Sequence, residues 1–250
     1  MELQPLKTFR VSSNQASLLT HDGRTLLIKR YAGGHQQQRR DCEEQTLRLW
    51  AEAGFKVPRP VAIDIPELRG SCYLAIEYLD GVTLQEHLQS VTTAFAEKME
   101  LLSRILRDNC RRQTLARQRQ EPRLLHPDPN SSNVICLGQD YYFIDFETTV
   151  ASGDLEEASA IETAKFCRWT ARDLGIEHLP ELARRVVESY QDQLPILRGI
   201  VSRTCGRPFQ FVHRWQDRRR KRRQPREVTK YDIADALAAA LRPATSHGRR

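Results

Sequence analysis

The stretch from Leu124 to Glu147, LLHPDPNSSNVICLGQDYYFIDFE, carries polar residues at intervals in an otherwise apolar segment: His126, Asp128, Asn133 and Asp145. Asp128 and Asn133 precede one apolar, strand-like segment, and Asp145 follows a second one. A short turn between two such strands brings the entrance and the exit of a hairpin together, so we expect these side chains to converge. Carboxylate and amide oxygens suit Mg²⁺, which takes its remaining ligands from water and substrate phosphates. The stretch therefore predicts a divalent-ion site beside a phosphate-bearing ligand.

Simpler explanations exist for each of these residues. Asp128 and Asn133 are residue types that often cap turns. Asp145 is harder to explain in this way, because a carboxylate that ends a buried strand needs a partner or a metal ion. Lys29, on the predicted strand TLLIKRY, is either a solvated edge residue or a phosphate ligand. His126 is expected to hydrogen-bond its own loop rather than to transfer protons.

The first eighty residues are predicted to be rich in β-strands. RVSSNQASLLTHDGRTLLIKRY alternates around a turn at residues 21–23, which predicts a hairpin. RDCEEQTLRLWAEAG is expected to form a helix that ends at Gly54, because Leu47, Trp50 and Ala51 have helical spacing. VPRPVAI and SCYLAIEYL are predicted to be two further strands.

The remainder of the chain is predicted to be mainly helical apart from the hairpin. The expected helices are TLQEHLQ, AFAEKMELLSRILRDNCRRQTLARQ, EEASAIETAKFCRWTARDLG, LPELARRVVESYQDQL and TKYDIADALAAAL. This order predicts an α+β protein with a β-rich N-terminal lobe at residues 1–79 and a helical C-terminal lobe at residues 80–250. The connection is expected near residues 77–81.

Composition is that of an ordinary globular protein, with 28% charged and 40% hydrophobic residues. No apolar run approaches the roughly 20 residues that cross a bilayer. The six cysteines are scattered without a CxxC pair, which predicts reduced thiols rather than a zinc site or disulfides. The amino terminus lacks an apolar secretion signal, so we expect a cytoplasmic protein.

A basic segment suggests an anionic partner. The formal net charge is +7, and part of the excess lies in DRRRKRRQPR, residues 217–226. Such a run attracts phosphate-rich surfaces, so either an anionic membrane surface or a nucleic acid is an expected partner. A peripheral location at the inner membrane would follow from the first of these. A solvated basic loop without a partner is the alternative.

HPDPNSSN followed by IDFE resembles the H-R-D-x-x-x-x-N catalytic loop and the D-F-G metal loop of the protein-kinase-like superfamily. LLIK resembles the V-A-I-K strand of that superfamily, EEQTLRLWAEAG its glutamate-bearing helix, and IEYLDG the segment between its lobes. The motifs occur in the superfamily's order over residues 10–150. The resemblance implies a bilobal protein-kinase-like fold, ATP and Mg²⁺ as cofactors, and phosphate transfer to a hydroxyl acceptor.

The resemblance also implies a role for each matching residue. Asp128 would position the acceptor hydroxyl and take its proton, while Asn133 and Asp145 would hold Mg²⁺. The backbone of residues 77–79 would contact adenine. These residues are Glu77, Tyr78 and Leu79.

Lys29 matches the lysine that binds the α- and β-phosphates of ATP. Its predicted ion-pair partner is Glu43 rather than Glu44, because this choice turns Leu47 and Trp50 of the same helix inward. Catalysis in this superfamily rests mainly on placement and on electrostatic neutralisation of phosphate charge, so a few rigidly held groups suffice.

Several features depart from the pattern of the superfamily. VSSNQASL stands where a glycine-rich loop is expected, so the close backbone approach to phosphates that glycine allows is less assured. Glu147 replaces the glycine of D-F-G, where its carboxylate either adds an ionic contact or faces solvent. Pro127 and Pro129 flank Asp128 and stiffen its loop. Nothing after Glu147 resembles the activation segment of regulated protein kinases.

These departures favour the atypical small kinases, which include the lipopolysaccharide core (Kdo/heptose) kinases, the RIO-type kinases and the kinase associated with tRNA threonylcarbamoylation. We expect the first branch, because the basic segment suits a phosphorylated, membrane-bound acceptor. The acceptor would then be a sugar of the lipopolysaccharide core or a related envelope glycolipid, and the protein would act in lipopolysaccharide biosynthesis. An atypical serine/threonine protein kinase is one alternative, and a pseudokinase that acts as a binding module is another.

Overall fold

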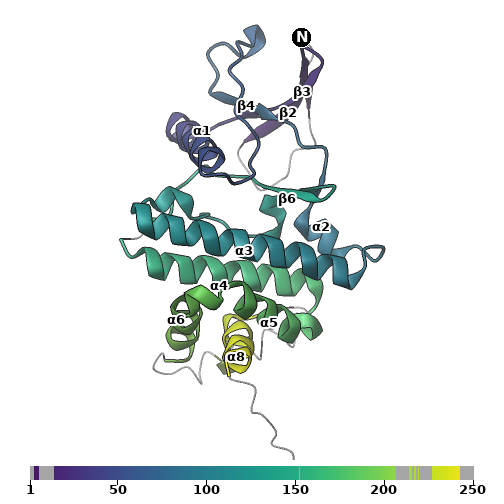
Figure 1. Cartoon of the computed structure of the whole chain (residues 1–250). Coiled ribbons are helices and arrows are strands. Elements are labelled where there is room, and N and C mark those ends of the chain that lie inside the picture. The colour runs from purple at the N-terminus through teal and green to yellow at the C-terminus, as the bar shows by residue number, and fades with distance from the viewer. Residues whose placement is uncertain are drawn as a thin grey trace, which may run out of the picture. The chain divides into compact units, whose positions relative to one another are not determined.

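The computed structural model describes residues 3–5, 14–151, 153–206 and 227–242, together with residues 214, 215, 217 and 219. Two small antiparallel sheets and a set of longer helices confirm the predicted α+β class (Figure 1). The chain forms two compact units. The first consists of Met1–Thr83, His126–Asp128 and Asn133–Ala151, and the second of Leu84–Leu125, Pro129–Ser132 and Ser152–Arg250.

The larger sheet has four antiparallel strands in the order β1-β2-β3-β4 (Figure 1). The strands are β1 Leu3–Pro5, β2 Gln15–His21, β3 Arg24–Arg30 and β4 Tyr73–Glu77. Asp22 and Gly23, with φ of 50° and 71°, form the turn between β2 and β3. Left-handed backbone at both central residues matches the twist of paired strands, which is why Asp-Gly is favoured there. The predicted hairpin is confirmed, and it places Lys29 opposite Ala16 and Leu74.

The predicted strand VPRPVAI is wrong. In this segment, a single bridge joins Pro60 to Ile76 of β4, and the Val61 N–H donates to the Ala75 carbonyl at 2.9 Å. The segment runs beside β4 without becoming a strand, because Pro58 and Pro60 lack the N–H groups that a continuous ladder requires.

Helix α1, Gln36–Glu52, ends just before Gly54, the residue predicted to stop it. Gly54 has a φ of 79°, and its N–H donates to the Ala51 carbonyl at 3.0 Å, an arrangement that favours glycine just beyond a helix. Leu47 and Trp50 are fully buried. The helical spacing grouped Ala51 with these two residues, but Ala51 is exposed and does not share their buried face. It adjoins Trp50 in the chain, and neighbours in a helix point about 100° apart.

The smaller sheet has the order β5-β6-β7 and consists of Val82–Thr83, Val134–Leu137 and Asp140–Phe143. Gly81 precedes β5, where a Cβ atom would meet the Cys136 carbonyl oxygen at 2.3 Å, so the close backbone approach requires glycine. The hairpin of β6 and β7 was predicted to lie in the helical lobe. The hairpin and β5 group instead with the first unit, in which the Phe143 N–H donates to the Lys56 carbonyl at 3.0 Å.

The second unit is helical, and α3 and α4 lie side by side in it (Figure 1). Its α-helices are α2 Leu84–Gln89, α3 Phe95–Arg119, α4 Leu155–Leu174, α5 Leu179–Ser189, α6 Leu194–Cys205 and α8 Lys230–Ala240. Among the described residues, the short 3₁₀-helices are η1 Pro66–Leu68, η2 Pro122–Leu124, η3 Ser131–Asn133, η4 Ile176–His178 and η5 Gln191–Gln193. The helix predicted for LPELARRVVESYQDQL ends early, at Ser189. Pro195 follows at the start of α6, where a proline begins a helix but cannot continue one.

A buried ion pair joins the two longest helices. Arg112 of α3 lies 2.5 Å from Glu162 of α4, and both side chains are almost completely buried. Gln113 donates a second hydrogen bond to Glu162 at 3.0 Å. Arg112 also donates to the carbonyl of Leu124, so this pair fixes the chain just before His126.

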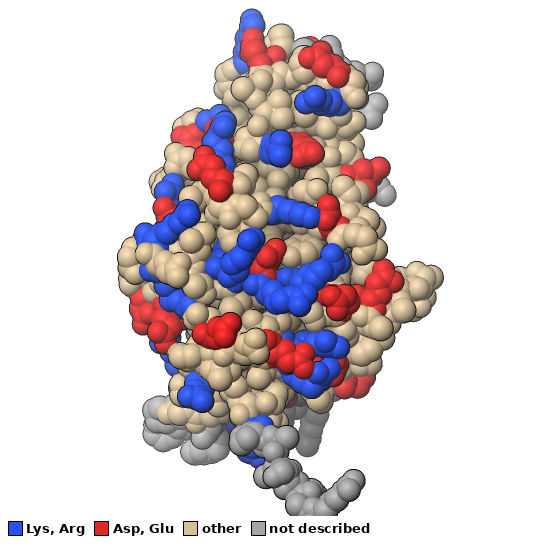
Figure 2. Space-filling model, in the orientation of Figure 1, with Lys and Arg blue, Asp and Glu red and all other residues tan. Residues whose placement is uncertain are grey.

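The described surface mixes both signs of charge. Figure 2 shows a face on which Lys and Arg side chains are interspersed with Asp and Glu. Ion pairs between partly exposed residues include Arg184 with Glu181 at 2.5 Å. The basic segment predicted to bind an anionic partner lies outside the described residues except for Asp217 and Arg219. Within the described ranges, no helix combines the length and the apolar character needed to cross a membrane.

Candidate active site

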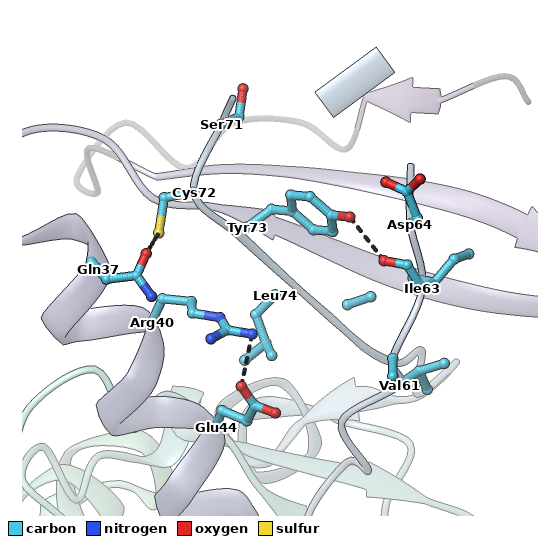
Figure 3. Close-up of a pocket in the computed structure, with 12 residues that line it drawn as sticks. Gln37, Arg40, Glu44, Val61, Ile63, Asp64, Ser71, Cys72, Tyr73 and Leu74 are labelled. Carbon is cyan, nitrogen blue, oxygen red and sulfur yellow. Dashed lines mark hydrogen bonds and ion pairs between the residues drawn. The ribbon is translucent and has the colours of Figure 1, made fainter. Parts of the chain in front are cut away.

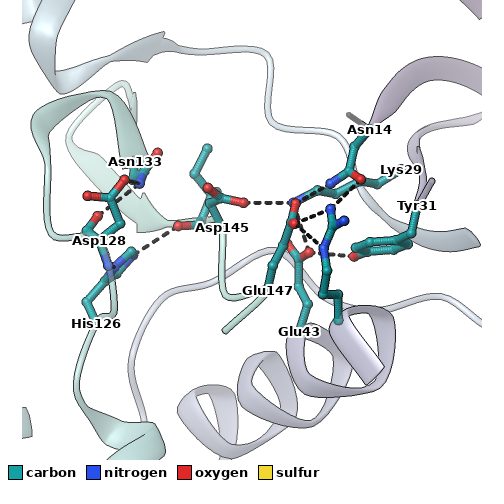
Figure 4. Close-up of polar contacts among 11 residues, drawn as sticks. Asn14, Lys29, Tyr31, Glu43, His126, Asp128, Asn133, Asp145 and Glu147 are labelled. Carbon is teal, nitrogen blue, oxygen red and sulfur yellow. Dashed lines mark hydrogen bonds and ion pairs between the residues drawn. The ribbon is translucent and has the colours of Figure 1, made fainter. Parts of the chain in front are cut away.

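Lys29 projects from β3 into a group of three carboxylates (Figure 4). Its Nζ lies 2.9 Å from Glu43 Oε2, 2.8 Å from Asp145 Oδ1 and 2.6 Å from Glu147 Oε1. Glu43 comes from α1, whereas the other two carboxylates follow β7. The ion pair of Lys29 with Glu43 is the predicted one, and Glu44 pairs instead with arginines of its own helix.

Burial and ion pairing act in opposite directions in this group. Burial opposes the charged form of Lys29, but Glu43, Asp145 and Glu147 outweigh it, so the pKa of Lys29 is raised above its ordinary value. Burial raises the pKa of Glu43, although attraction to Lys29 opposes the shift. Burial also opposes the charged form of Asp145, yet Lys29 holds the pKa of that carboxyl below its ordinary value. At neutral pH the centre of the site is therefore an ammonium beside an ionised Asp145.

Further residues extend the group, and sequence reasoning did not predict them. Arg39 of α1 approaches Glu147 Oε2 through Nε at 2.9 Å and Nη2 at 2.6 Å. Asn14 donates to Glu147 and accepts from Arg39 at 2.5 Å. Tyr31 donates its hydroxyl proton to Glu43 at 2.5 Å. The only available signal was the position of Asn14 in the segment where a phosphate-binding loop is expected.

The backbone at Asp145 explains how a side chain is tolerated at Glu147. Asp145 has a φ of 73°, in the left-handed region that aspartate tolerates better than most residues. Glu147 has no positive φ, so its backbone does not require the glycine expected from D-F-G. Its carboxylate makes ionic contacts, which decides between the two alternatives left open by the sequence.

A second group of polar residues lies on the other side of Asp145 (Figure 4). Asn133 donates through Nδ2 to the Asp128 backbone carbonyl at 2.9 Å and to its carboxylate at 3.3 Å. The Asp128 N–H donates to His126 Nδ1 at 3.2 Å, so the proton of the neutral ring lies on Nε2, which is 3.0 Å from the Ile144 carbonyl. His126 thus hydrogen-bonds its own loop, as predicted, and it also ties the loop to Ile144, the residue that precedes Asp145.

Aromatic side chains form an apolar support for both groups. Trp50 of α1 packs on Phe146 with ring centroids 4.6 Å apart and on Phe143 at 5.3 Å. His126 lies 4.8 Å from Phe146. Trp50 and Phe146 are fully buried, so the residue between Asp145 and Glu147 is fixed in the core while its neighbours face the polar site.

The structure places the candidate adenine segment at the end of β4. The N–H groups of Glu77 and Tyr78 bond to the carbonyls of Arg59 and Thr25 at 2.9 Å and 3.3 Å. The N–H groups of both residues are therefore engaged within the protein.

The donor atoms fit a hard divalent cation. Glu43, Asp145 and Glu147 each offer a carboxylate oxygen, and these oxygens lie within 4.8 Å of one another. Asn133 uses its amide nitrogen toward Asp128, which makes Oδ1 the atom that would bind a cation. Oxygen donors of this kind suit Mg²⁺.

A cavity of about 720 Å³ lies elsewhere in the first unit, between α1 and the segments at residues 61–64 and 71–75 (Figure 3). Some of its polar side chains bond to one another. Arg40 pairs with Glu44 at 2.8 Å, and the Cys72 thiol donates to Gln37 at 3.6 Å. The cavity contains none of the predicted site residues.

Residues 6–111 match the family model described as the phosphotransferase enzyme family, APH. The matched segment is less than half of the chain, and it includes Lys29 and Glu43 but ends before Asp128. No curated protein matches the chain in a sequence comparison. Over this segment the chain is similar to that family, which is part of the protein-kinase-like superfamily, and the match gives no support to the lipopolysaccharide kinase or RIO-type branch.

Replacing Glu147 by Gln should reduce stability more than the same change at Glu44. Glu147 is about four-fifths buried and contacts both Lys29 and Arg39, so a neutral amide leaves two partly buried cations with weaker partners. We expect a loss of about 1–3 kcal/mol in the free energy of unfolding, measured by urea denaturation. The more exposed pairs of Glu44 with Arg40 and Arg48 should be worth about 0.5 kcal/mol. Equal losses would show that the contacts of Glu147 add nothing.

Proposed function

We propose that this protein is an ATP- and Mg²⁺-dependent phosphotransferase that acts on a hydroxyl group. The observation that supports the proposal is the contact of Lys29 with both Glu43 and Asp145, at 2.9 Å and 2.8 Å. A lysine held by one carboxylate beside a second that suits a metal ion is a site for a nucleotide phosphate chain.

Each group in the site has a role in this proposal. Lys29, oriented by Glu43, binds the α- and β-phosphates. Asp145 and Asn133 hold Mg²⁺, which when bound neutralises the charge of the phosphate oxygens. The backbone at Glu77 and Leu79 contacts adenine.

Asp128 is assigned to the acceptor. Its side chain is exposed, unlike that of Asn133, so it is accessible to an incoming hydroxyl. The contact with Asn133 and the His126 bond to its N–H hold it in one orientation. In this role Asp128 positions the acceptor hydroxyl and takes its proton.

For the acceptor we propose a sugar or glycolipid, with a sugar of the lipopolysaccharide core as the specific candidate. The lack of any segment resembling the activation segment of protein kinases supports a small acceptor over a protein. A protein kinase activity would appear as phosphate transfer to protein substrates. A pseudokinase would bind ATP without turning it over.

We expect ATP with Mg²⁺ to raise the melting temperature of the wild-type protein in a thermal-shift measurement. Asp145→Ala should abolish the part of the increase that depends on Mg²⁺, because the carboxylate that suits the ion is lost. Asp140→Ala is the matched control, since Asp140 lies at the turn of the same hairpin and pairs only on the surface, with Lys56. A wild-type melting curve that ATP and Mg²⁺ leave unchanged would rule out a nucleotide role.

Asp128→Ala should leave ATP binding nearly intact and reduce phosphate transfer by about 10²–10⁴-fold, as expected for the loss of a general base. Binding is measured by the thermal shift and transfer by formation of ADP from ATP. If the variant loses binding and transfer equally, Asp128 has a structural role.

The basic segment at residues 217–226 is proposed to bind an anionic membrane surface, which would bring the protein to a glycolipid acceptor. Its deletion should weaken cosedimentation with anionic vesicles, and rising salt should weaken binding by the full chain in the same way. Zwitterionic vesicles are the control. Salt-sensitive binding to RNA but not to vesicles would indicate a nucleic-acid partner, and binding to neither would leave the segment a linker.

A further inference from the structure

Asp173 is a buried carboxylate in the last turn of α4. Its side chain is fully shielded from solvent. Oδ2 accepts a hydrogen bond from the Ser131 hydroxyl, and Oδ1 accepts one from Gln89 Nε2 at 3.1 Å. Arg172 approaches Oδ1 at 3.3 Å and lies over the Trp169 ring at 4.0 Å from its centroid.

This position is unfavourable for helix stability. A negative charge near the C-terminus of a helix is repelled by the helix dipole. Burial of a carboxylate adds a desolvation cost, which its hydrogen bonds and its ion pair must offset. Arg172 compensates only in part, because its side chain is 38% exposed. Packing of α4 therefore does not by itself explain an aspartate at residue 173.

Ser131 links this carboxylate to the loop that carries the proposed catalytic groups. It lies three residues after Asp128 and two before Asn133, and it is 1% exposed. The adjacent Ser132 is exposed, and its N–H bonds within the loop to Asn130 at 2.8 Å. Ser131 is thus the serine through which the loop is anchored to α4.

We propose that Asp173 is a positioning residue that fixes the backbone between Asp128 and Asn133 through Ser131. The inference rests on the proposed phosphotransferase function. An ionised carboxylate only accepts hydrogen bonds, so the Ser131 hydroxyl must donate and is held in one orientation. This sets the direction of the loop on both sides of Ser131, and with it the separation of the proposed base from the proposed metal ligand. A small displacement of either group is costly for transfer.

The test uses the full chain with Mg²⁺ and ATP, and it measures both phosphate release and ATP binding. Ser131→Ala and Asp173→Asn should each lower kcat for phosphate release by about 10- to 100-fold, while the KM for ATP is unchanged. The loss in the double variant should be smaller than the product of the two single losses, because both changes act on the bond between Ser131 and Asp173, while Asp173→Asn also alters the contacts with Gln89 and Arg172. Ser132→Ala is the matched control in the same loop and should behave as wild type.

A second readout does not depend on activity. In amide hydrogen exchange, residues 126–133 should exchange faster in both single variants than in wild type or Ser132→Ala. Unchanged exchange in Ser131→Ala would overturn the proposal, as would losses of kcat that add in the double variant. If wild type neither binds nor hydrolyses ATP, the proposed function fails, and exchange still decides whether Asp173 holds the loop.

Discussion

The burial of one ammonium among three carboxylates is the constraint on which the candidate site depends. Lys29 and Arg39 carry two positive charges against three negative charges on Glu43, Asp145 and Glu147, so the group has a net charge of minus one when all are ionised. Removing such charges from water is costly unless each is paired. The excess negative charge favours an added cation, and the raised pKa of Glu43 marks the carboxylate that protonates most readily without one.

Apolar packing provides the rigidity that this charge group requires. Phe146 is buried against Trp50 and His126, and it stands between the two carboxylates that contact Lys29. Its chain neighbours therefore cannot move independently of the core. Trp50 lies on the same helix as Glu43, so one aromatic cluster positions both sides of the ion pair. Truncating it would displace several charges at once.

Sequence reasoning succeeded where a local pattern has one physical cause. The turn at Asp22 and Gly23 requires left-handed backbone. If Trp50 faces the core, Glu43 rather than Glu44 is placed to pair with Lys29. It failed where distant segments decide the outcome. The contacts of Arg39 with Asn14 and Glu147 join three segments that are far apart in the sequence, and no periodic pattern in the sequence indicates them. The hairpin of β6 and β7 likewise belongs to a compact unit in which β6 pairs with β5. The spacing of residues in the sequence does not reveal this pairing.

The group around Lys29 and the group around Asp128 differ in solvent exposure, and this difference fits the two proposed roles, binding of ATP and binding of the acceptor. Lys29 and Glu43 are largely enclosed, while the Asp145 side chain that Lys29 holds is 43% exposed, which suits binding of a charged ligand that displaces existing ion pairs. Asp128 is exposed and held mainly through its backbone and one amide, which suits an acceptor that arrives from solvent. The left-handed turn at Asp145 lets the chain pass from the buried β7 to a residue facing both groups. Because this turn is made at Asp145, residue 147 can carry a charged side chain and join the ammonium cluster.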